Sequence, residues 1–247
     1  MNGPRFSSVL FALFLAPVFL VFGGETAITV GVDPPWILRG DGYLIVTKSS
    51  TATNLDDAAI PAELLDSYVN DINLMLLVDY RESPVGPYGE LLYMPGNFRF
   101  MDGWRHFSIT KIFVDSQQSL EDGRRNWGIP KELAHFSFQE DGLHSEIVTV
   151  GSAGQTFAQM RFTPFGPRFP VNTFWIAPVF RTLGQVLNDT TFVFSLSGEG
   201  RARLVHFEPI FFDGDHFPDM PARQVLAAFR IEDFTLVFPE PQTFEMP

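Results

Sequence analysis

The sequence predicts a mainly β protein, an antiparallel barrel or sandwich with a few helices packed outside it. Most apolar segments are short, rich in Val, Ile, Phe and Thr, and bounded by Gly, Pro, Asn or Asp, which is the pattern of β-strands. Helical spacing of apolar residues is confined to two short stretches. The chain has 247 residues, 45% of them hydrophobic, so it can bury one large core.

Ten strands follow from this pattern. Period-two alternation is clearest at 192–196 and at 201–205, and the Gly198-Glu199-Gly200 segment between them predicts a hairpin turn. The predicted strands are residues 42–48, 73–80, 88–94, 106–114, 135–139, 146–150, 156–163, 191–196, 203–207 and 228–237.

Two helices are expected. The first spans 61–68, where Pro61 stands near a first helical position. The second spans 116–126, with Asp115 or Ser116 as its N-cap and acidic residues in its early turns.

The N-terminus has the features of a secretory signal peptide. A nearly unbroken apolar run at 9–22 follows Met1 and Arg5, and it is shorter than the roughly 20 residues of a transmembrane helix. We therefore expect a signal peptide or hydrophobic leader at 1–24, a single domain at 28–244, and a secreted protein. An uncleaved membrane anchor and a cytoplasmic protein are the alternatives.

Composition excludes several classes of function. The formal net charge is −12, from 17 basic and 29 acidic residues, so neither nucleic acid nor a stable membrane partner is expected. The chain has no Cys, which rules out disulfides and cysteine nucleophiles. The acidic turn at 213–216 matches no standard calcium loop, and no metal site is predicted. An amine nucleophile has three candidates, Lys48, Lys111 and Lys131.

Three segments carry a family resemblance. They are a Tyr-x-Glu motif at 88–90, a Gly-Arg-x5-Pro-Lys-x-Leu motif at 123–133, and the segment 35–43. In their order and spacing they resemble the acetoacetate decarboxylase superfamily, from about Pro35 to Phe238. The resemblance implies a cone-like antiparallel β-barrel with a flanking sheet and a few helices, in agreement with the predicted strands.

The resemblance also implies a catalytic pair. The lysine of the second motif is Lys131, the expected Schiff-base nucleophile at the end of an apolar cavity, and the glutamate of the first is Glu90, which would move protons. Acetoacetate decarboxylase is itself a standard example of an activated lysine. A neutral amine attacks a carbonyl to form an iminium, which accepts the electrons of the breaking bond. No metal or organic cofactor is therefore expected.

The chain departs from the decarboxylases at three positions. Glu132 replaces a second lysine directly after Lys131, and it should face away from the cavity because adjacent residues of an extended chain point to opposite faces. Met75 stands at the position of the other active-site glutamate, counted without gaps from the first motif. Asp41 stands where the decarboxylases have an arginine, and Arg39, on the same strand face, is the expected carboxylate clamp.

Tyr88 and Trp127 complete the expected substrate-binding set with Arg39 and Met75. The leading interpretation is a Schiff-base lyase acting on a small or medium oxo acid or ketone, with decarboxylation, retro-aldol cleavage and dehydration left open. A barrel that binds an apolar small molecule without covalent chemistry is the alternative, and a secreted structural or interaction protein is the third hypothesis. The partner is a small-molecule carbonyl compound, and homo-oligomerisation is left open.

Overall fold

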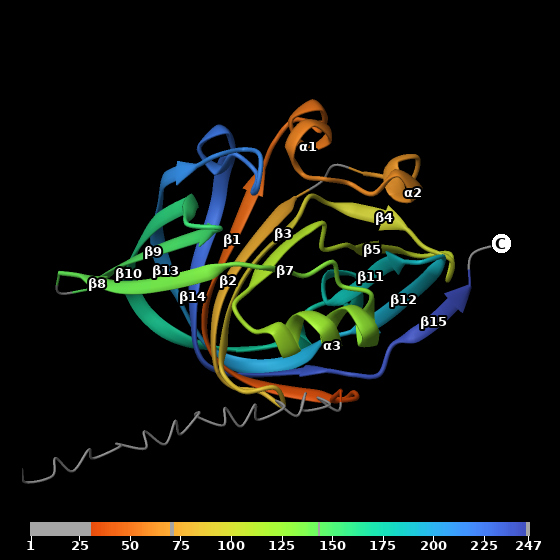
Figure 1. Ribbon diagram of the computed structural model, residues 1–247. Coiled ribbons are helices and arrows are strands. Elements are labelled where there is room, and N and C mark those ends of the chain that lie inside the picture. The colour runs from red at the N-terminus through yellow and green to blue at the C-terminus, as the bar shows by residue number, and fades with distance from the viewer. Residues whose placement is uncertain (1–30, 70–71, 143, 246–247) are drawn as a thin grey trace, which may run out of the picture. The chain divides into compact units, whose positions relative to one another are not determined.

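The computed structural model describes residues 31–69, 72–142 and 144–245 (Figure 1). Residues from Gly31 onward form one compact unit. The expected signal peptide at 1–24 lies outside the described residues. Among the residues that are described, no helix is long and apolar enough to cross a membrane.

The main element of the unit is a ten-stranded sheet that curls until it nearly closes (Figure 1). Its outermost strands in the hydrogen-bonding order are β7 and β8, which only Ala134 separates in the chain. Neighbouring strands are antiparallel except β6 and β7. The order is β7 (Glu132–Leu133), β6 (Lys111–Val114), β3 (Tyr88–Met94), β2 (Asn73–Glu82), β1 (Trp36–Lys48), β14 (Gln224–Phe238), β13 (Ser197–Phe212), β10 (Gln155–Asn172), β9 (Ser145–Ser152) and β8 (His135–Asp141).

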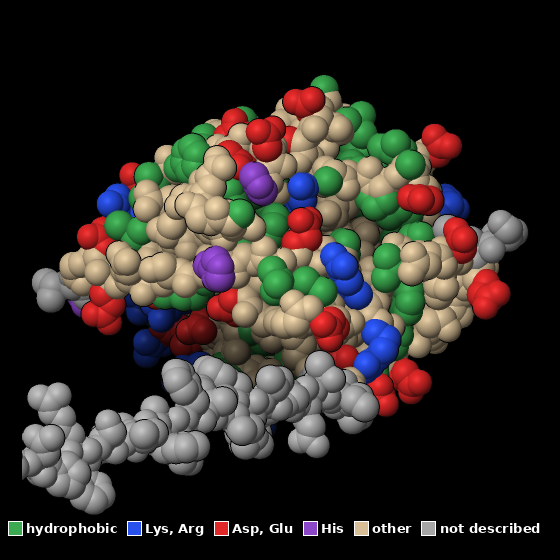
Figure 2. Space-filling view, in the orientation of Figure 1, with side chains coloured by type: hydrophobic (Ala, Val, Ile, Leu, Met, Phe, Trp, Pro, Cys, Tyr) green, Lys and Arg blue, Asp and Glu red, His purple; other side chains and the backbone are tan. Residues whose placement is uncertain are grey.

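A second sheet flanks the first, so the predicted mainly β fold, a barrel-like sheet with a flanking sheet and few helices, is confirmed. Its order is β15 (Gln242–Glu245), β12 (Thr190–Ser195), β11 (Thr182–Leu187), β5 (Arg105–Phe107) and β4 (Asn97–Arg99). The helices are α1 (Thr51–Asp57), α2 (Ala62–Leu65) and α3 (Gln117–Trp127), with short 3-10 helices η1 (Thr173–Trp175), η2 (Pro178–Phe180) and η3 (Met220–Ala222). On the face that Figure 2 shows, acidic side chains are widely spread.

The large sheet buries a separate cluster on each of its faces. Side chains alternate along a strand, so Met75 and Leu77 of β2 enter the inner cluster, where the Tyr43 ring stacks on Phe162 of β10 at a centroid distance of 3.8 Å. Tyr80 of the same strand enters the outer cluster, which also includes side chains of β11, β12 and α3. We call this outer cluster the site layer, because it holds the candidate active site.

The helix prediction at 116–126 is confirmed by α3, whose N-cap is Ser116. The Ser116 hydroxyl accepts a hydrogen bond from the Ser119 backbone N–H at 3.2 Å. The helix predicted at 61–68 shortens to α2, which follows Pro61. The helix α1 was not predicted.

The predicted hairpin turn at 198–200 is wrong. These residues lie inside β13, where Gly198 pairs with Leu236 of β14 and Gly200 with Val171 of β10. A Cβ atom on Gly198 would lie 2.5 Å from the Thr235 carbonyl oxygen. The two glycines therefore mark a close backbone approach and a register shift, a role that glycine has inside strands as well as in turns.

Candidate active site

A buried lysine and a buried glutamate are in direct contact in the site layer. Lys131 Nζ donates a hydrogen bond to Glu90 Oε2 at 2.9 Å. The two residues are only 4% and 3% exposed. The residues of the two sequence motifs, 41 positions apart in the chain, therefore lie together as a charged pair shielded from water.

The position of Glu90 follows from strand pairing. β3 lies between β2 and β6, and Glu90 is opposite Val78 on one side and Val114 on the other. Tyr80, diagonally across from Glu90 on β2, donates its hydroxyl to Glu90 Oε1 at 3.2 Å. Burial, and then the nearby Glu90 charge, raise the pKa of Tyr80 well above its usual value. The phenol therefore remains protonated and able to donate.

The position of Lys131 follows from the end of α3. Gly128 caps this helix in the left-handed conformation, with φ of 65°, and its N–H points back to the carbonyl oxygens of Arg124 and Gly123. The chain then reaches Lys131 and enters the short strand β7. The lysine stem lies against Gly123, where a Cβ atom would be 2.8 Å from Lys131 Cε. The motif glycine thus provides the space for the motif lysine.

Two further side chains contact the amine. Lys131 Nζ also donates to Ser119 Oγ at 2.9 Å, and it lies 5.1 Å from the ring centroid of Tyr88, within the range of a cation–π interaction. Burial, and then the Glu90 charge, raise the pKa of Tyr88 well above its usual value, whereas a hydrogen bond with Ser119 acts in the opposite direction. The immediate environment of the amine is thus partly polar, in contrast to the apolar cavity that the family resemblance implies.

Sequence reasoning missed Ser119 and Tyr80. Ser119 precedes Gly123 by one helical turn, so a helix written over 116–126 would have placed both on one face. Tyr80 pairs with Tyr88 in the β2–β3 hairpin. The short connection between the predicted strands could have indicated this register.

The structure does not bring Met75 or Arg39 into the site layer. Met75 is fully buried in the inner cluster, on the opposite face of the sheet from Glu90. Arg39 lies on the exposed end of β1, where its guanidinium contacts Glu82 at 2.9 Å. Its side chain is 55% exposed, so the expected carboxylate clamp is held at the surface in an ion pair.

Trp127 lies in the site layer as a packing residue. Its ring meets Trp36 edge-on at a centroid distance of 5.0 Å, and its indole N–H donates to the Pro239 carbonyl oxygen at 2.7 Å. Glu132 is exposed whereas Lys131 is buried, which agrees with the expectation that Glu132 faces away.

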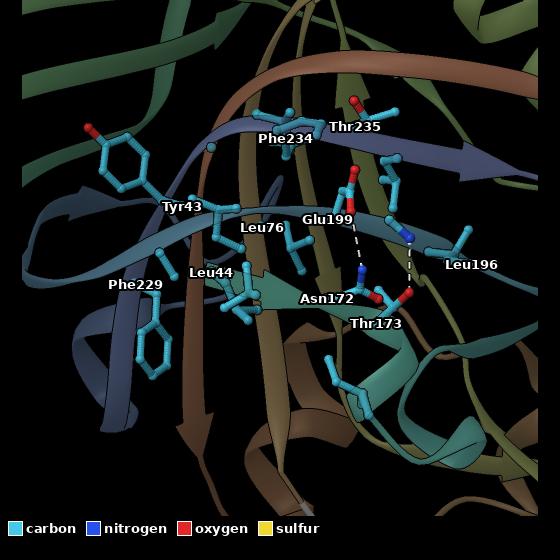
Figure 3. A pocket seen from close by; sticks show the side chains of 18 of the residues that line it. Tyr43, Leu44, Leu76, Asn172, Thr173, Leu196, Glu199, Phe229, Phe234 and Thr235 are labelled. Carbon is cyan, nitrogen blue, oxygen red and sulfur yellow. Dashed lines mark hydrogen bonds between the residues drawn. The ribbon is translucent and has the colours of Figure 1, made fainter. Parts of the chain in front are cut away.

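The structure also has an apolar cavity of about 360 Å³ (Figure 3). Its wall includes aliphatic and aromatic side chains of β1, β2, β10, β13 and β14. Tyr80 lines the cavity and also holds Glu90. Lys131 and Glu90 are not among the lining residues. Tyr80 therefore links the cavity to the charged pair.

The described part of the chain contains no group of three or more His, Cys, Asp or Glu residues arranged to hold a metal ion. In the acidic turn at 213–216, Asp213 instead pairs with His216, its Oδ2 lying 2.6 Å from the ring Nδ1. The same carboxylate caps backbone N–H groups of the turn. This turn is a self-contained Asx-type structure.

The fold and the site define the class: a nearly closed, mainly antiparallel barrel with a buried lysine–glutamate pair on its outer face. The sequence comparison identifies the family. The family model described as acetoacetate decarboxylase (ADC) matches residues 43–172, more than half of the chain. The chain therefore belongs to the acetoacetate decarboxylase family. The matched segment contains Glu90 and Lys131.

The chain is also similar to individual proteins and to solved structures. The protein NEOXANTHIN-DEFICIENT 1 of Oryza sativa subsp. japonica is 28% identical over 141 residues, which cover 54% of this chain and 44% of the rice protein. The chain thus spans less than half the length of that relative. Acetoacetate decarboxylase from Legionella pneumophila has a similar fold, with a TM-score of 0.64 at 12% identity over 95% of this chain and 98% of that chain. The enduracididine biosynthesis enzyme MppR gives 0.63 at 12% identity, over 87% and 89%.

Proposed function

We propose that this protein is a Schiff-base-forming lyase that acts on a small or medium oxo acid or ketone through Lys131. The observation that carries the proposal is the direct contact, at 2.9 Å, between the buried Lys131 amine and the Glu90 carboxylate. A buried amine with an adjacent proton acceptor is the arrangement that imine formation needs. Membership of the acetoacetate decarboxylase family supports the same chemistry.

The contacts of Lys131 and Glu90 support the following steps. Glu90 takes a proton from the Lys131 ammonium, and the neutral amine attacks the substrate carbonyl to form a carbinolamine. Glu90 returns the proton to the carbinolamine hydroxyl, which leaves as water and gives an iminium. In decarboxylation the iminium nitrogen accepts the electron pair of the bond to the departing carbon dioxide. In retro-aldol cleavage Glu90 takes the proton of the β-hydroxyl, and the iminium accepts the electron pair of the carbon–carbon bond as the aldehyde fragment departs. In both cases protonation of the enamine and hydrolysis of the iminium release the product and restore Lys131. In dehydration Glu90 takes an α-proton, the iminium accepts the electron pair of that C–H bond, and the enamine expels the β-hydroxyl, which Glu90 protonates so that it leaves as water. Hydrolysis of the unsaturated iminium then restores Lys131.

Tyr80 and Ser119 are positioning residues in this scheme. The Tyr80 hydroxyl donates to Glu90 Oε1 at 3.2 Å, and the Lys131 amine donates to the other carboxylate oxygen, Oε2, at 2.9 Å. Ser119 holds the amine from the helix side at 2.9 Å. Arg39 has no part in the scheme because Glu82 holds it at the surface, which supports a ketone or an apolar oxo acid over acetoacetate itself.

A second function, the binding of an apolar small molecule without covalent chemistry, is favoured by one observation. The residues that line the 360 Å³ cavity do not include Lys131 or Glu90. In that case the Lys131–Glu90 pair would be a structural element behind Tyr80.

Borohydride trapping separates the two functions. The protein is incubated with a panel of ketones and oxo acids and reduced with borohydride, and the added mass is located by peptide mass spectrometry. The proposal predicts addition at Lys131 and its loss in Lys131→Ala. The other two lysines serve as matched controls, because Lys48→Ala and Lys111→Ala should leave trapping unchanged. Tight binding of apolar compounds without trapping at Lys131 would contradict the lyase and support the binding protein.

A further inference from the structure

The apolar cavity has the composition of a hydrocarbon-binding site. Its wall includes Leu44, Leu76, Phe229, Ile231 and Phe234, several of which are labelled in Figure 3. Its volume of about 360 Å³ lies within the range of small-molecule pockets. At roughly 30 Å³ for each water-sized group, it can hold about a dozen non-hydrogen atoms, which exceeds the needs of a three- or four-carbon oxo acid.

The polar groups at the rim of the cavity are engaged with one another. Asn172 Nδ2 donates to Glu199 Oε2 at 3.3 Å, and the Gly198 backbone N–H donates to Thr173 Oγ1 at 2.9 Å (Figure 3). A ligand in the cavity therefore meets mainly carbon atoms, and its affinity rises with the apolar area that it buries.

The cavity and the charged pair have one contacting residue in common, Tyr80. Tyr80 lines the cavity and donates to Glu90, and its ring meets Phe234 of the cavity wall edge-on at a centroid distance of 5.9 Å. A molecule whose chain fills the cavity would thus point one end at Tyr80, the residue that separates it from Glu90 and Lys131.

We propose that the cavity is the subsite for the apolar chain of the carbonyl substrate. The substrate is then an amphipathic ketone or oxo acid, with its carbonyl at Lys131 and an aliphatic tail of up to about eight to ten carbons, given the room for about a dozen heavy atoms. This inference rests on the proposed lyase function and names its substrate class.

The first test is a chain-length series of straight-chain methyl ketones. The half-saturating concentration for borohydride trapping at Lys131 should fall about four-fold for each added methylene group, until the tail fills the cavity, and should then level off. A half-saturating concentration that is independent of chain length would overturn the inference.

Variants of the cavity wall give the second test. Leu44→Trp fills the cavity and should raise the half-saturating concentration of the longest ketone at least ten-fold more than that of acetone. Leu226→Trp is the matched control, since Leu226 lies on β14 outside the cavity and is 47% exposed. Because Leu44→Trp can fail to fold, Leu76→Ala, which enlarges the cavity, should move the levelling point to longer chains. Equal effects of Leu44→Trp and Leu226→Trp would contradict the assignment.

Calorimetric binding of the same ketones to Lys131→Ala separates this inference from the lyase function. Binding that strengthens with chain length supports the subsite even when wild-type protein shows no trapping, in which case only the lyase function fails. Trapping at Lys131 without any dependence on chain length leaves the lyase function standing and overturns the subsite.

Discussion

Replacing Gly123 by alanine tests how the lysine is held. A Cβ atom at Gly123 would lie 2.8 Å from Lys131 Cε and 2.9 Å from Cδ. Carbon atoms in favourable contact lie about 3.5 Å or more apart, so the lysine stem must move by roughly 0.7 Å. Its hydrogen bonds to Glu90 and Ser119, both 2.9 Å long, would then lengthen to about 3.6 Å, beyond hydrogen-bond reach.

The energetic balance predicts a net loss of stability. Glycine to alanine inside a helix ordinarily gains about 1 kcal/mol. Against this stands the loss of hydrogen bonds to a charged group, each worth about 1.5–3 kcal/mol. We therefore expect Gly123→Ala to lower the free energy of unfolding by about 2 kcal/mol, measured by urea denaturation, and to slow borohydride trapping at least ten-fold.

A double-mutant cycle checks the cause. In the Lys131→Ala background no stem is left to displace, so Gly123→Ala should stabilise the protein by about 1 kcal/mol, the ordinary helix-propensity gain. Arg124→Ala, at the adjacent exposed position of α3, controls for changes in the helix itself. A Gly123→Ala protein that is more stable than wild type and traps at the normal rate would refute the packing of Lys131 against this glycine.

Three further outcomes are expected. Glu90→Gln leaves the buried Lys131 amine without its carboxylate and should lower the free energy of unfolding by about 3–5 kcal/mol. Glu90→Gln combined with Lys131→Met should recover most of this lost stability. A double variant that is as unstable as Glu90→Gln would argue against a coupled pair. Glu132→Gln should move the pH of half-maximal trapping by less than about one unit, because Glu132 is exposed; a shift of two units would place it in the site. Burial raises the pKa of Tyr93 to about 12, so Tyr93 keeps its proton in the folded state at a pH where it ionises in the unfolded chain, near pH 10. The free energy of unfolding should therefore fall by about 2–3 kcal/mol between about pH 10 and 12. Urea denaturation of the wild type and of Tyr93→Phe measures this difference.

The strands and the Lys131–Glu90 contact were predictable for different reasons. Strands such as 88–94 were predicted with their observed bounds because a buried strand needs a short, β-branched and aromatic segment that ends in turn residues. Glu90 and Lys131 were paired through the two motifs, and the glycine that precedes the lysine in its motif has a local reason in the clash that a Cβ atom would cause at Gly123.

The features that the sequence did not predict depend on contacts between residues that are far apart in the chain. The Gly198–Gly200 segment reads as a turn by composition, and only the close approach of β14 shows that it is a continuous strand. Met75 was placed by ungapped counting, and a shift of one residue in a strand moves a side chain to the other face. Arg39 was predicted to bind the substrate carboxylate because its strand face could be estimated from the sequence. Its ion-pair partner Glu82 depends on the register between β1 and β2, which the sequence alone does not give.

The replacement of a second lysine by Glu132 has a physical consequence for the site. Glu132 faces outward, so it neither helps nor hinders Lys131 directly, and the contacts that remain to the amine are Glu90, Ser119 and the Tyr88 ring. In the proposed mechanism a proton moves from the amine to Glu90 before the amine attacks the carbonyl. In the proposed substrate complex the tail would fill the cavity that Tyr80 lines. The proposed apolar subsite and the Lys131–Glu90 pair therefore share one contacting residue, Tyr80.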